Sequence, residues 1–483
     1  MPDSIARCAA FATGELKTKI AVAPAAVSGA IPCMPSAEER TTPEPTDRMP
    51  PGIIYIVGNE AAERFSYYGM NSILVVFMTQ YLADGHGHPA HMSEAQADAW
   101  YHSFVSILYI LPILGAFLAD AVIGKYRTVL FLSIVYCFGH FALALDDTRL
   151  GLVVGLGLIA LGAGGIKPCV STIVGDQFGA SNQHLLTRVF SWFYFSINFG
   201  SAFSTLLIPW LLDNVSPRIA FATPGVFMVL ATVIFWLGRR KFVRVPAVGI
   251  RTYAGAVFRR ENLGAIWNLL MLVPFVAMFW ALWQQNFSSW VVQADRMDRH
   301  LFGTEWLPGQ IQTVNPIFIL GMLPLFSYVL YPVINRVFPL TPLRKIGMGL
   351  FLVAAAFLIV GGIQLRIDAG GHPHILWQIL AFVVLTAAEI MVSVTHLEFA
   401  YTQAPKEMKS LVMCTYLGAI SLGNVFTAGV NFFIQNPDGT TKLTGASYFF
   451  FFAAVMFVTA LLFLPVASLY RGHTQTVNEP TPA

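Results

Sequence analysis

The run Glu60-Ala61-Ala62-Glu63-Arg64-Phe65-Ser66-Tyr67-Tyr68-Gly69 places three charged side chains inside a long apolar segment. At about 3.6 residues per helical turn, the polar side chains of this segment share one face. Those side chains are Glu60, Glu63, Arg64, Tyr67 and Asn71. A charge in the middle of a bilayer costs roughly 2.5 to 3.5 kcal/mol, so lipid cannot cover this face. We therefore expect the face to contact protein or water, and a functional role is the usual reason for such residues.

The rest of the chain is apolar enough to fold in a lipid bilayer. Hydrophobic residues make up 56% of its 483 positions and charged residues 11%, with a mean hydropathy of +0.63. Soluble domains are about 25% charged. Twelve apolar segments have spanning length, near 52–82, 97–122, 127–147, 150–175, 184–213, 219–238, 264–294, 310–335, 343–366, 374–402, 408–435 and 444–470. The sequence predicts an all-α, multi-pass integral membrane protein surrounded by a lipid bilayer.

Lysine and arginine residues are divided unevenly between alternate loops, with sixteen on one side and six on the other. Because positive loops stay in the cytoplasm, both termini are expected there, in a protein of the cell (inner) membrane. The basic clusters at 239–241 and 259–260 flank membrane segments. That position favours contact with the membrane edge over binding of nucleic acid, so no nucleic-acid partner is expected.

The chain divides at two changes of composition. Residues 1–50 are rich in proline and lack a periodic apolar face, which predicts a disordered cytoplasmic tail. The spans then form an N-terminal bundle at 51–238 and a C-terminal bundle at 264–471. A basic cytoplasmic linker at 239–263 joins them, and a cytoplasmic tail follows at 472–483. No signal peptide is expected, and the five cysteines lack the spacing of a disulfide or metal framework.

Several motifs resemble those of known transporters. The pattern Gly-x-x-x-Ala-Asp-x-x-x-Gly-Lys-x-Arg at 115–127 resembles the loop motif of the major facilitator superfamily. A narrower resemblance, to the proton-dependent oligopeptide transporters, rests on Glu-x-x-Glu-Arg-Phe-x-Tyr-Tyr-Gly, which is complete at 60–69. Two further signatures lie at 162–168 with 176–178, and at 193–201. Shorter matches at 279–280, 312–315 and 398–405 extend the likeness from about residue 51 to the last span.

This resemblance implies a major facilitator fold, with twelve transmembrane helices in two six-helix bundles that rock around a central site. It also implies a proton-coupled symporter that imports di- and tripeptides by alternating access. The coupling ion is the proton and no other cofactor is implied. Other members with the same first-helix motif carry nitrate or other small solutes, and this alternative stays open.

Six residues are expected to couple protons to transport: Glu60, Glu63, Arg64, His102, Lys167 and Glu389. Lys167 lies deep in the fourth span and Glu389 in the middle of the tenth, in opposite halves. Neither charge is stable in lipid without a partner, so we expect them to pair across the halves. The resemblance gives such a pair a role in gating and coupling, and a purely structural buried ion pair is the alternative.

His102 shares a helical face with Ser106 and Tyr109, which predicts a polar wall. An unperturbed imidazole titrates near pH 6.5, which suits a proton carrier. The residue matches the proton-linked histidine of animal-like members of the family. A hydrogen-bonded packing histidine is the alternative.

A zwitterionic peptide needs a cation for its carboxylate and an acid with neutral acceptors for its ammonium. By resemblance, Arg64 and Lys167 supply the first, while Glu389, Asn198 and Asn315 supply the second. Aromatic residues are expected to form the walls: Tyr67, Tyr68, Tyr109, Tyr194 and Trp280.

One position departs from the family pattern, because Gln284 stands where an acid is common. Whether Arg64 has an extracellular partner is therefore left open. Two other classes of function were weighed. An intramembrane enzyme is disfavoured, since no His-Glu-x-x-His and no convincing Gly-x-Ser-x-Gly occurs, and no catalytic or metal-binding residues are assigned. A channel would differ in its steady conductance.

Overall fold

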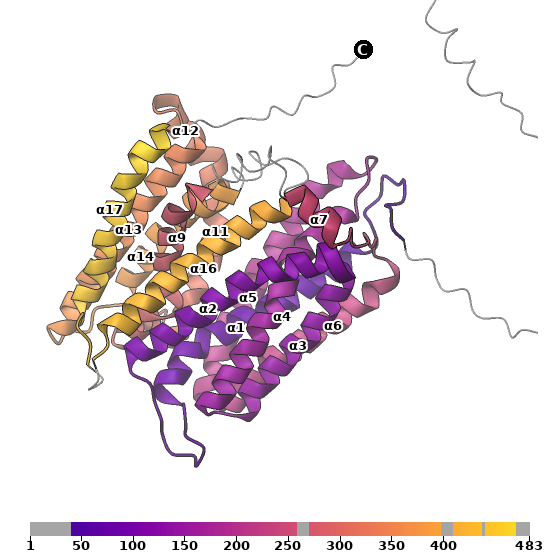
Figure 1. Cartoon of the computed structure of the whole chain (residues 1–483). Coiled ribbons are helices and arrows are strands. Elements are labelled where there is room, and N and C mark those ends of the chain that lie inside the picture. Colours follow the sequence, from indigo (N-terminus) through magenta and orange to yellow (C-terminus); the bar gives the residue numbers. More distant parts are fainter. Residues whose placement is uncertain (1–39, 258–269, 398–408, 437–439, 470–483) are drawn as a thin grey trace, which may run out of the picture. The chain divides into compact units, whose positions relative to one another are not determined.

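Long helices joined by short loops make up the computed structural model (Figure 1). It describes residues 40–257, 270–397, 409–436 and 440–469, all within the unit Glu39–Ala483. The first half contains α1 Ile53–Gln80, α2 Glu94–Phe117, α3 Lys125–Leu145, α4 Arg149–Asp176, α5 Leu186–Asn214, α6 Pro217–Leu237 and α7 Ile250–Val257. The second half contains α9 Val273–Trp283, α10 Ser289–Asp295, α11 Val314–Leu325, α12 Tyr331–Val337, α13 Pro342–Asp368, α14 Leu376–Glu389, α16 Lys409–Ile434 and α17 Ala446–Leu469.

Shorter elements connect or extend these helices. The antiparallel strands β1 His300–Leu301 and β2 Thr304–Glu305 form a small hairpin. Three π-helical segments continue α2, α11 and α14, at Leu118–Ile123, Phe326–Leu330 and Ile390–Val394. Single 3₁₀ turns lie at Gln183–Leu185, Gly238–Arg240, Gln284–Phe287 and Pro308–Thr313.

Helix starts follow the local sequence. Ser93 and Gln96 form a capping box at α2, and the Thr148 hydroxyl accepts backbone N–H groups at α4. Pro217 and Pro342 stand in the first turns of α6 and α13, where a missing N–H is harmless. The starts of α2, α4, α6 and α13 therefore have identifiable signals in the sequence.

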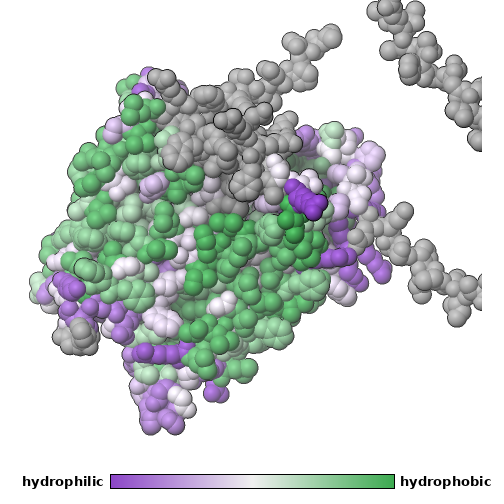
Figure 2. Space-filling view, in the orientation of Figure 1, coloured by the Kyte–Doolittle hydropathy of each residue, from purple (hydrophilic) through white to green (hydrophobic). Residues whose placement is uncertain are grey.

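Ten helical stretches of the described chain are long and apolar enough to cross a membrane. The first and seventh predicted spans are not among these ten stretches. α1 carries Glu60, Glu63 and Arg64, and the seventh is broken into α9, a 3₁₀ turn and α10. Large apolar side chains face outward elsewhere, such as Phe138 with 63% exposure. Hydrophobic residues cover the middle of the face drawn in Figure 2. The prediction of a multi-pass membrane protein is confirmed.

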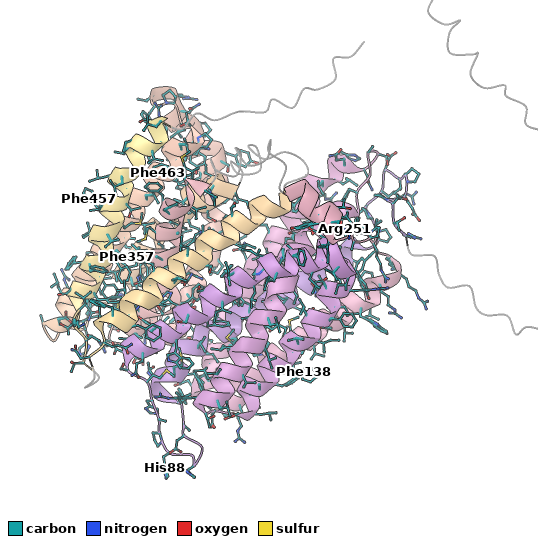
Figure 3. The ribbon with its side chains drawn as sticks, in the orientation of Figure 1. His88, Phe138, Arg251, Phe357, Phe457 and Phe463 are labelled. Atoms are coloured by element: carbon teal, nitrogen blue, oxygen red, sulfur yellow. The ribbon has the colours of Figure 1, made fainter. Side chains whose placement is uncertain are left out.

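Successive membrane helices run in opposite directions, so their connecting loops lie alternately at two ends of the described unit. We call the end with loops 81–93, 146–148, 296–307 and 369–375 the hairpin end. There Ala83 N donates to Asp147 O and Asp298 N donates to Pro373 O. The linker end carries 118–124, 177–185 and 238–249, and Val248 N donates to Asp120 O there. Figure 3 places His88 at the hairpin end and Arg251 at the linker end.

Most helix pairs form within one half, such as α3 with α4, α1 with α5, and α13 with α17. The pair α2 and α16 is an extensive contact between the halves. Close approach depends on glycine: a Cβ on Gly115 would lie 2.2 Å from Gly164 O, and one on Gly423 would lie 2.2 Å from Ala277 O. These contacts fix the helices that carry the polar side chains.

Three parts of the chain differ from expectation or lie outside the description. Residues 40–50, expected in a disordered tail, are held at the linker end by Arg244 N donating to Arg40 O and Asn182 Nδ2 donating to Arg48 O. The predicted basic linker contains the short helix α7. The tail segments 1–39 and 472–483, the linker part 258–263 and the motif at 398–405 lie outside the described residues. The predicted boundaries of the two bundles stay predictions.

Candidate functional site

The polar face of α1 is buried as predicted. Glu60 is 3% exposed, Glu63 0% and Arg64 9%. Arg64 Nε lies 2.8 Å from Glu60 Oε1 and 2.8 Å from Glu63 Oε2. The bond to Glu60 has hydrogen-bond geometry, whereas Glu63 is held by charge alone and its oxygens have no hydrogen-bond partner among the described residues. Glu63 is thus a carboxylate with free acceptor capacity inside the protein.

Lys167 on α4 completes this charged cluster. Its ammonium lies 4.2 Å from the centre of the Tyr67 ring and 5.1 Å from that of Tyr109. A cation over aromatic faces is stabilised by the ring quadrupoles. Lys167 also interacts electrostatically with Arg64, Glu63 and Glu60. The cluster therefore contains two acids and two cations, and no net formal charge when all four are ionised.

Glu389 ends α14 in the other half. Its Oε2 accepts hydrogen bonds from Asn315 Nδ2 and Trp283 Nε1, each at 2.9 Å. Asn315 also bonds to Thr386 Oγ1 at 3.1 Å. A carboxylate that holds two donors is fixed in orientation and keeps its second oxygen for another partner. The Glu389 carboxylate thus faces neutral donors.

The predicted ion pair between Lys167 and Glu389 is not formed in this conformation, and the prediction needs correction. Each residue is satisfied by groups of its own half, Lys167 by aromatic rings and α1 acids and Glu389 by amide and indole donors. Local partners do not require the two halves to close. The proposed coupling role of the two residues is a separate question that this geometry leaves as a prediction.

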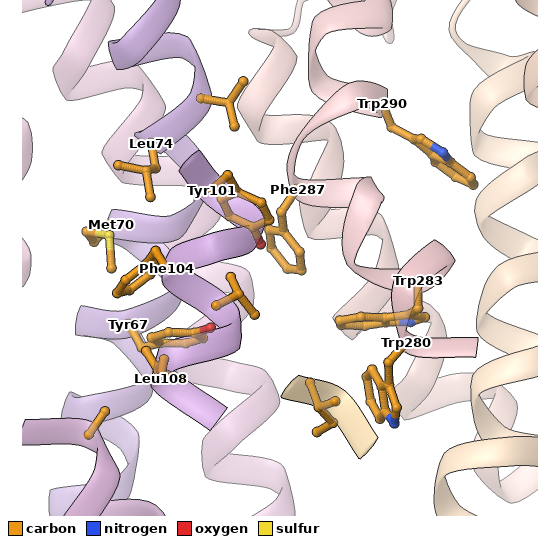
Figure 4. Packing of buried hydrophobic residues seen from close by; sticks show 14 of the residues in the cluster. Tyr67, Met70, Leu74, Tyr101, Phe104, Leu108, Trp280, Trp283, Phe287 and Trp290 are labelled. Carbon is orange, nitrogen blue, oxygen red and sulfur yellow. The ribbon is translucent and has the colours of Figure 1, made fainter. Parts of the chain in front are cut away.

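Aromatic side chains from both halves meet between these charges. Tyr68 stacks on Phe287 at 6.2 Å, and Trp280 packs edge-on against Trp283 at 5.1 Å. Figure 4 shows Tyr67 opposite Trp280 and Trp283. On α5, Asn198 Nδ2 donates to Tyr194 O at 2.9 Å, and Tyr194 packs against a cluster that includes residues of α11 and of the segment after α14. The five predicted wall residues therefore divide between the two halves.

His102 lies apart from the charged cluster, in a contact between the halves. Nδ1 is 2.7 Å from Asn424 Oδ1 on α16, and Nε2 is 3.1 Å from Ser288 Oγ. Ser106, on the same face, lies 3.1 Å from Ser421 Oγ. Tyr109 instead faces Lys167. The predicted polar face of α2 therefore has two roles. His102 and Ser106 bind α2 to α16, whereas Tyr109 lies next to Lys167 in the charged cluster.

Sequence reasoning missed several partners of the predicted residues. Trp283 donates a hydrogen bond to Glu389. Ser288 and Asn424 lie within hydrogen-bond distance of His102. Tyr416 packs edge-on against Trp280 at 6.0 Å. An asparagine within an apolar span is the one available signal, since an unpartnered amide is costly there. That signal applies to Asn424 and Asn431, both fully buried in α16.

A first prediction concerns Asn315. Replacing it with alanine removes one of the two donors to Glu389. A hydrogen bond to a charged group contributes about 1.5 to 3 kcal/mol, so we expect the half-saturating substrate concentration to rise roughly tenfold or more. Concentration-dependent exchange in proteoliposomes measures this effect. Asn214→Ala, on an exposed residue at the end of α5, is the control. Equal half-saturation for both variants would contradict the prediction.

A second prediction concerns Gln284, which is buried at the end of α9. Arg64 already has two acidic neighbours on its own helix. We call the region between the two halves that holds the charged groups the junction; its charged residues are Glu60, Glu63, Arg64, Lys167 and Glu389. Gln284→Glu adds a further negative charge there, and one more proton is needed to neutralise it. We expect the pH optimum of uptake to move toward lower pH. Identical pH profiles of the variant and the unchanged protein would show that the missing acid is irrelevant.

The fold and the site together place the protein in a class: multi-pass helical membrane proteins with buried side chains of opposite charge where their two halves meet. Comparison with known proteins specifies it further. The model of the family described as the POT family matches residues 126–254 and 256–447, more than half of the chain. The chain belongs to the POT family, which is a family of transporters.

Related sequences agree with this assignment. The chain is 36% identical to "Peptide transporter family 1" of Drosophila melanogaster over 372 residues, covering 67% of this chain and 49% of the fly protein. It is 34% identical to "Solute carrier family 15 member 2" of Mus musculus over 423 residues, covering 77% of this chain and 57% of the mouse protein. The chain thus spans about half the length of these relatives.

Solved structures confirm the fold. The POT family transporter PepTSo, crystallised in meso, matches with a TM-score of 0.80 and 33% identity over 88% of this chain and 99% of that one. An auto-inhibited POT family peptide transporter matches with a TM-score of 0.78 and 35% identity over 90% of this chain and 99% of that one. The predicted major facilitator fold is confirmed.

Proposed function

We propose that this protein is a proton-coupled symporter that imports di- and tripeptides by alternating access. The observation that carries the proposal is the distribution of charge: Arg64 and Lys167 belong to one half, and Glu389 with Asn315 belongs to the other. A zwitterionic peptide matches this arrangement with its carboxylate toward the first half and its ammonium toward the second. The names of the fly relative and of the auto-inhibited structural neighbour support a transported peptide.

The residues proposed to bind the peptide are those between the two charged groups: Arg64, Tyr67, Tyr68, Tyr109, Lys167, Tyr194, Asn198, Trp280, Asn315 and Glu389. Protons would act at Glu60, Glu63, Arg64, His102, Lys167 and Glu389. When all groups are ionised and His102 is neutral, the junction carries one net negative charge, because three acids face two cations. One proton neutralises it, and a zwitterion adds no charge. The loaded carrier can then close without stranding an ion.

The halves are joined at the hairpin end by several polar contacts. Arg296 pairs with Glu94, and Thr205 Oγ1 lies 2.8 Å from Thr313 Oγ1. We infer that the hairpin end faces the outside of the cell membrane, that both termini lie in the cytoplasm, and that this conformation is closed to the outside. Import requires these contacts to open and the linker end to close in turn.

Competition for uptake tests the substrate class. Proteoliposomes with an inward proton gradient take up a labelled dipeptide in the presence of unlabelled dipeptides, tripeptides, free amino acids or nitrate. Di- and tripeptides alone are expected to compete, because only they place both charged ends across the junction. Nitrate has no cationic end for Glu389. Competition by nitrate and none by tripeptides would replace the proposal with transport of another small solute.

A further inference from the structure

Asp98 is a buried acid to which the proposed function assigns no role. It lies on α2, one turn before His102, and is 5% exposed. Its Oδ1 has no hydrogen-bond partner among the described residues. An unpaired carboxylate in such a place costs several kcal/mol unless it takes up a proton or meets water. Its position therefore calls for a proton or a polar ligand.

Asp98 lines a cavity of about 110 Å³ with mixed polar and apolar walls between α2, α10, α13, α16 and α17. Such a volume admits several water molecules, and polar groups of Gln293, Gln364, Asn431 and Tyr448 line it. A groove of about 650 Å³ at the hairpin end shares part of this wall, including Glu94 and Arg296. Glu94 and Arg296, which form an ion pair, line both the cavity and the groove.

On its other side, Asp98 reaches a directed hydrogen-bond chain. Its carboxyl interacts with the Ser288 hydroxyl, which lies 3.1 Å from His102 Nε2. Asn424 Nδ2 donates to Ile420 O at 2.8 Å, so Asn424 Oδ1 is the acceptor for His102 Nδ1–H. Nε2 of neutral His102 is then an acceptor, and Ser288 donates to it. Ser288 Oγ remains free to accept from a protonated Asp98.

We propose that Asp98 is the residue that loads protons from the hairpin-end groove and passes them through Ser288 to His102. The inference rests on the proposed function, for which it names the proton entry. A proton from water adds to the Asp98 carboxylate. Asp98 then donates it to Ser288 Oγ while the Ser288 hydroxyl proton moves to His102 Nε2. The step ends with an Asp98 carboxylate and a His102 imidazolium, so protons and charge balance.

Other charged or titratable groups lie near this route. Their titration must be distinguished from that of Asp98 when the pH dependence of transport is measured. Glu94 on the same helix and Arg296 after α10 stand at the mouth, and Tyr448 of α17 faces the cavity. Asp368 at the end of α13 is already held by Gln364 Nε2 and the backbone N–H of Ala446. From α16, Asn424 and Asn431 contribute neutral amides. Asp98 is therefore the acid that faces both the cavity and Ser288.

The test compares gradient-driven accumulation of a dipeptide with exchange at equal pH, in proteoliposomes of the full chain. One pH unit supports about tenfold accumulation for one proton per peptide. Asp98→Asn and Ser288→Ala should both reduce this ratio toward one and flatten its dependence on pH at the hairpin end, while exchange persists. Asp98→Glu should restore coupling. Asp295→Asn, in the wall of the same groove, is the matched control and should accumulate normally.

The outcomes separate the inference from the function. Full accumulation by Asp98→Asn or by Ser288→Ala, beside a working unchanged protein, overturns the relay and leaves the proposed function standing. Loss of exchange together with accumulation in both variants assigns Asp98 and Ser288 a structural role and also overturns the relay. An unchanged protein that accumulates no dipeptide under any gradient overturns the proposed function and, with it, the relay.

Discussion

Glu63→Gln is expected to abolish accumulation of peptide against its gradient and to leave exchange of peptide across the membrane. Glu63 is fully buried, and its oxygens lack hydrogen-bond partners among the described residues. Arg64, whose Nε lies 2.8 Å from Glu63 Oε2, is shared with Glu60. A neutral amide retains the shape of the side chain but cannot carry the proton that would enter with the peptide. The peptide site proposed at Lys167 and Glu389 is unchanged in this variant.

The measurement is the ratio of internal to external dipeptide under an inward gradient of one pH unit. About tenfold accumulation is expected of the unchanged protein for one proton per peptide, and none of Glu63→Gln. Glu305→Gln, whose carboxyl is exposed at the hairpin end, controls for the loss of an acid. If Glu63→Gln accumulates peptide normally, Glu63 has no part in coupling. If it also loses exchange, its role is structural.

Lys167→Ala is expected to cause the second large loss. The alanine removes the ammonium that lies over Tyr67 and Tyr109 and the cation proposed for the peptide carboxylate. Truncating one partner of a buried charge pair costs about 2 to 5 kcal/mol. Peptide affinity should therefore fall at least about thirtyfold, since 1.36 kcal/mol corresponds to about tenfold.

Lys167→Arg should restore little, because a planar guanidinium does not replace a compact ammonium between two rings. Lys442→Ala, at the hairpin end, is the control, because the ammonium of this lysine donates to Phe433 O and lies over the Phe433 ring. Binding of labelled dipeptide to purified protein gives the affinities. Unchanged affinity in Lys167→Ala would remove Lys167 from the peptide site, whereas equal loss in Lys442→Ala would show a general effect on the fold.

The sequence predicts best where periodicity decides the environment of a side chain. The polar face from Glu60 to Asn71 had to avoid lipid, and these side chains are buried. Apolar segments of spanning length became helices for the same reason, since a bilayer leaves backbone groups no other partners. The motif in the charged segment of α1 resembles that of the POT family, to which the chain belongs.

Contacts between distant segments could not be predicted in this way. Periodicity places Lys167 and Glu389 on buried faces but gives no distance between them, and both found partners nearer by. Ser288 lies between the 3₁₀ turn at 284–287 and α10, and its contact with His102 joins segments far apart in the sequence. Asp98 had no visible role in the sequence, because its cavity is built from five helices.

The most direct test of proton-driven peptide import is uptake of a labelled dipeptide into proteoliposomes when the proton gradient alone is varied. An inward gradient should drive the internal concentration above the external one, with entry of protons in step with peptide. A protonophore that collapses the gradient should return the two peptide concentrations to equality. Accumulation that continues unchanged after the protonophore is added would contradict proton coupling, and a steady conductance without saturable uptake would identify a channel.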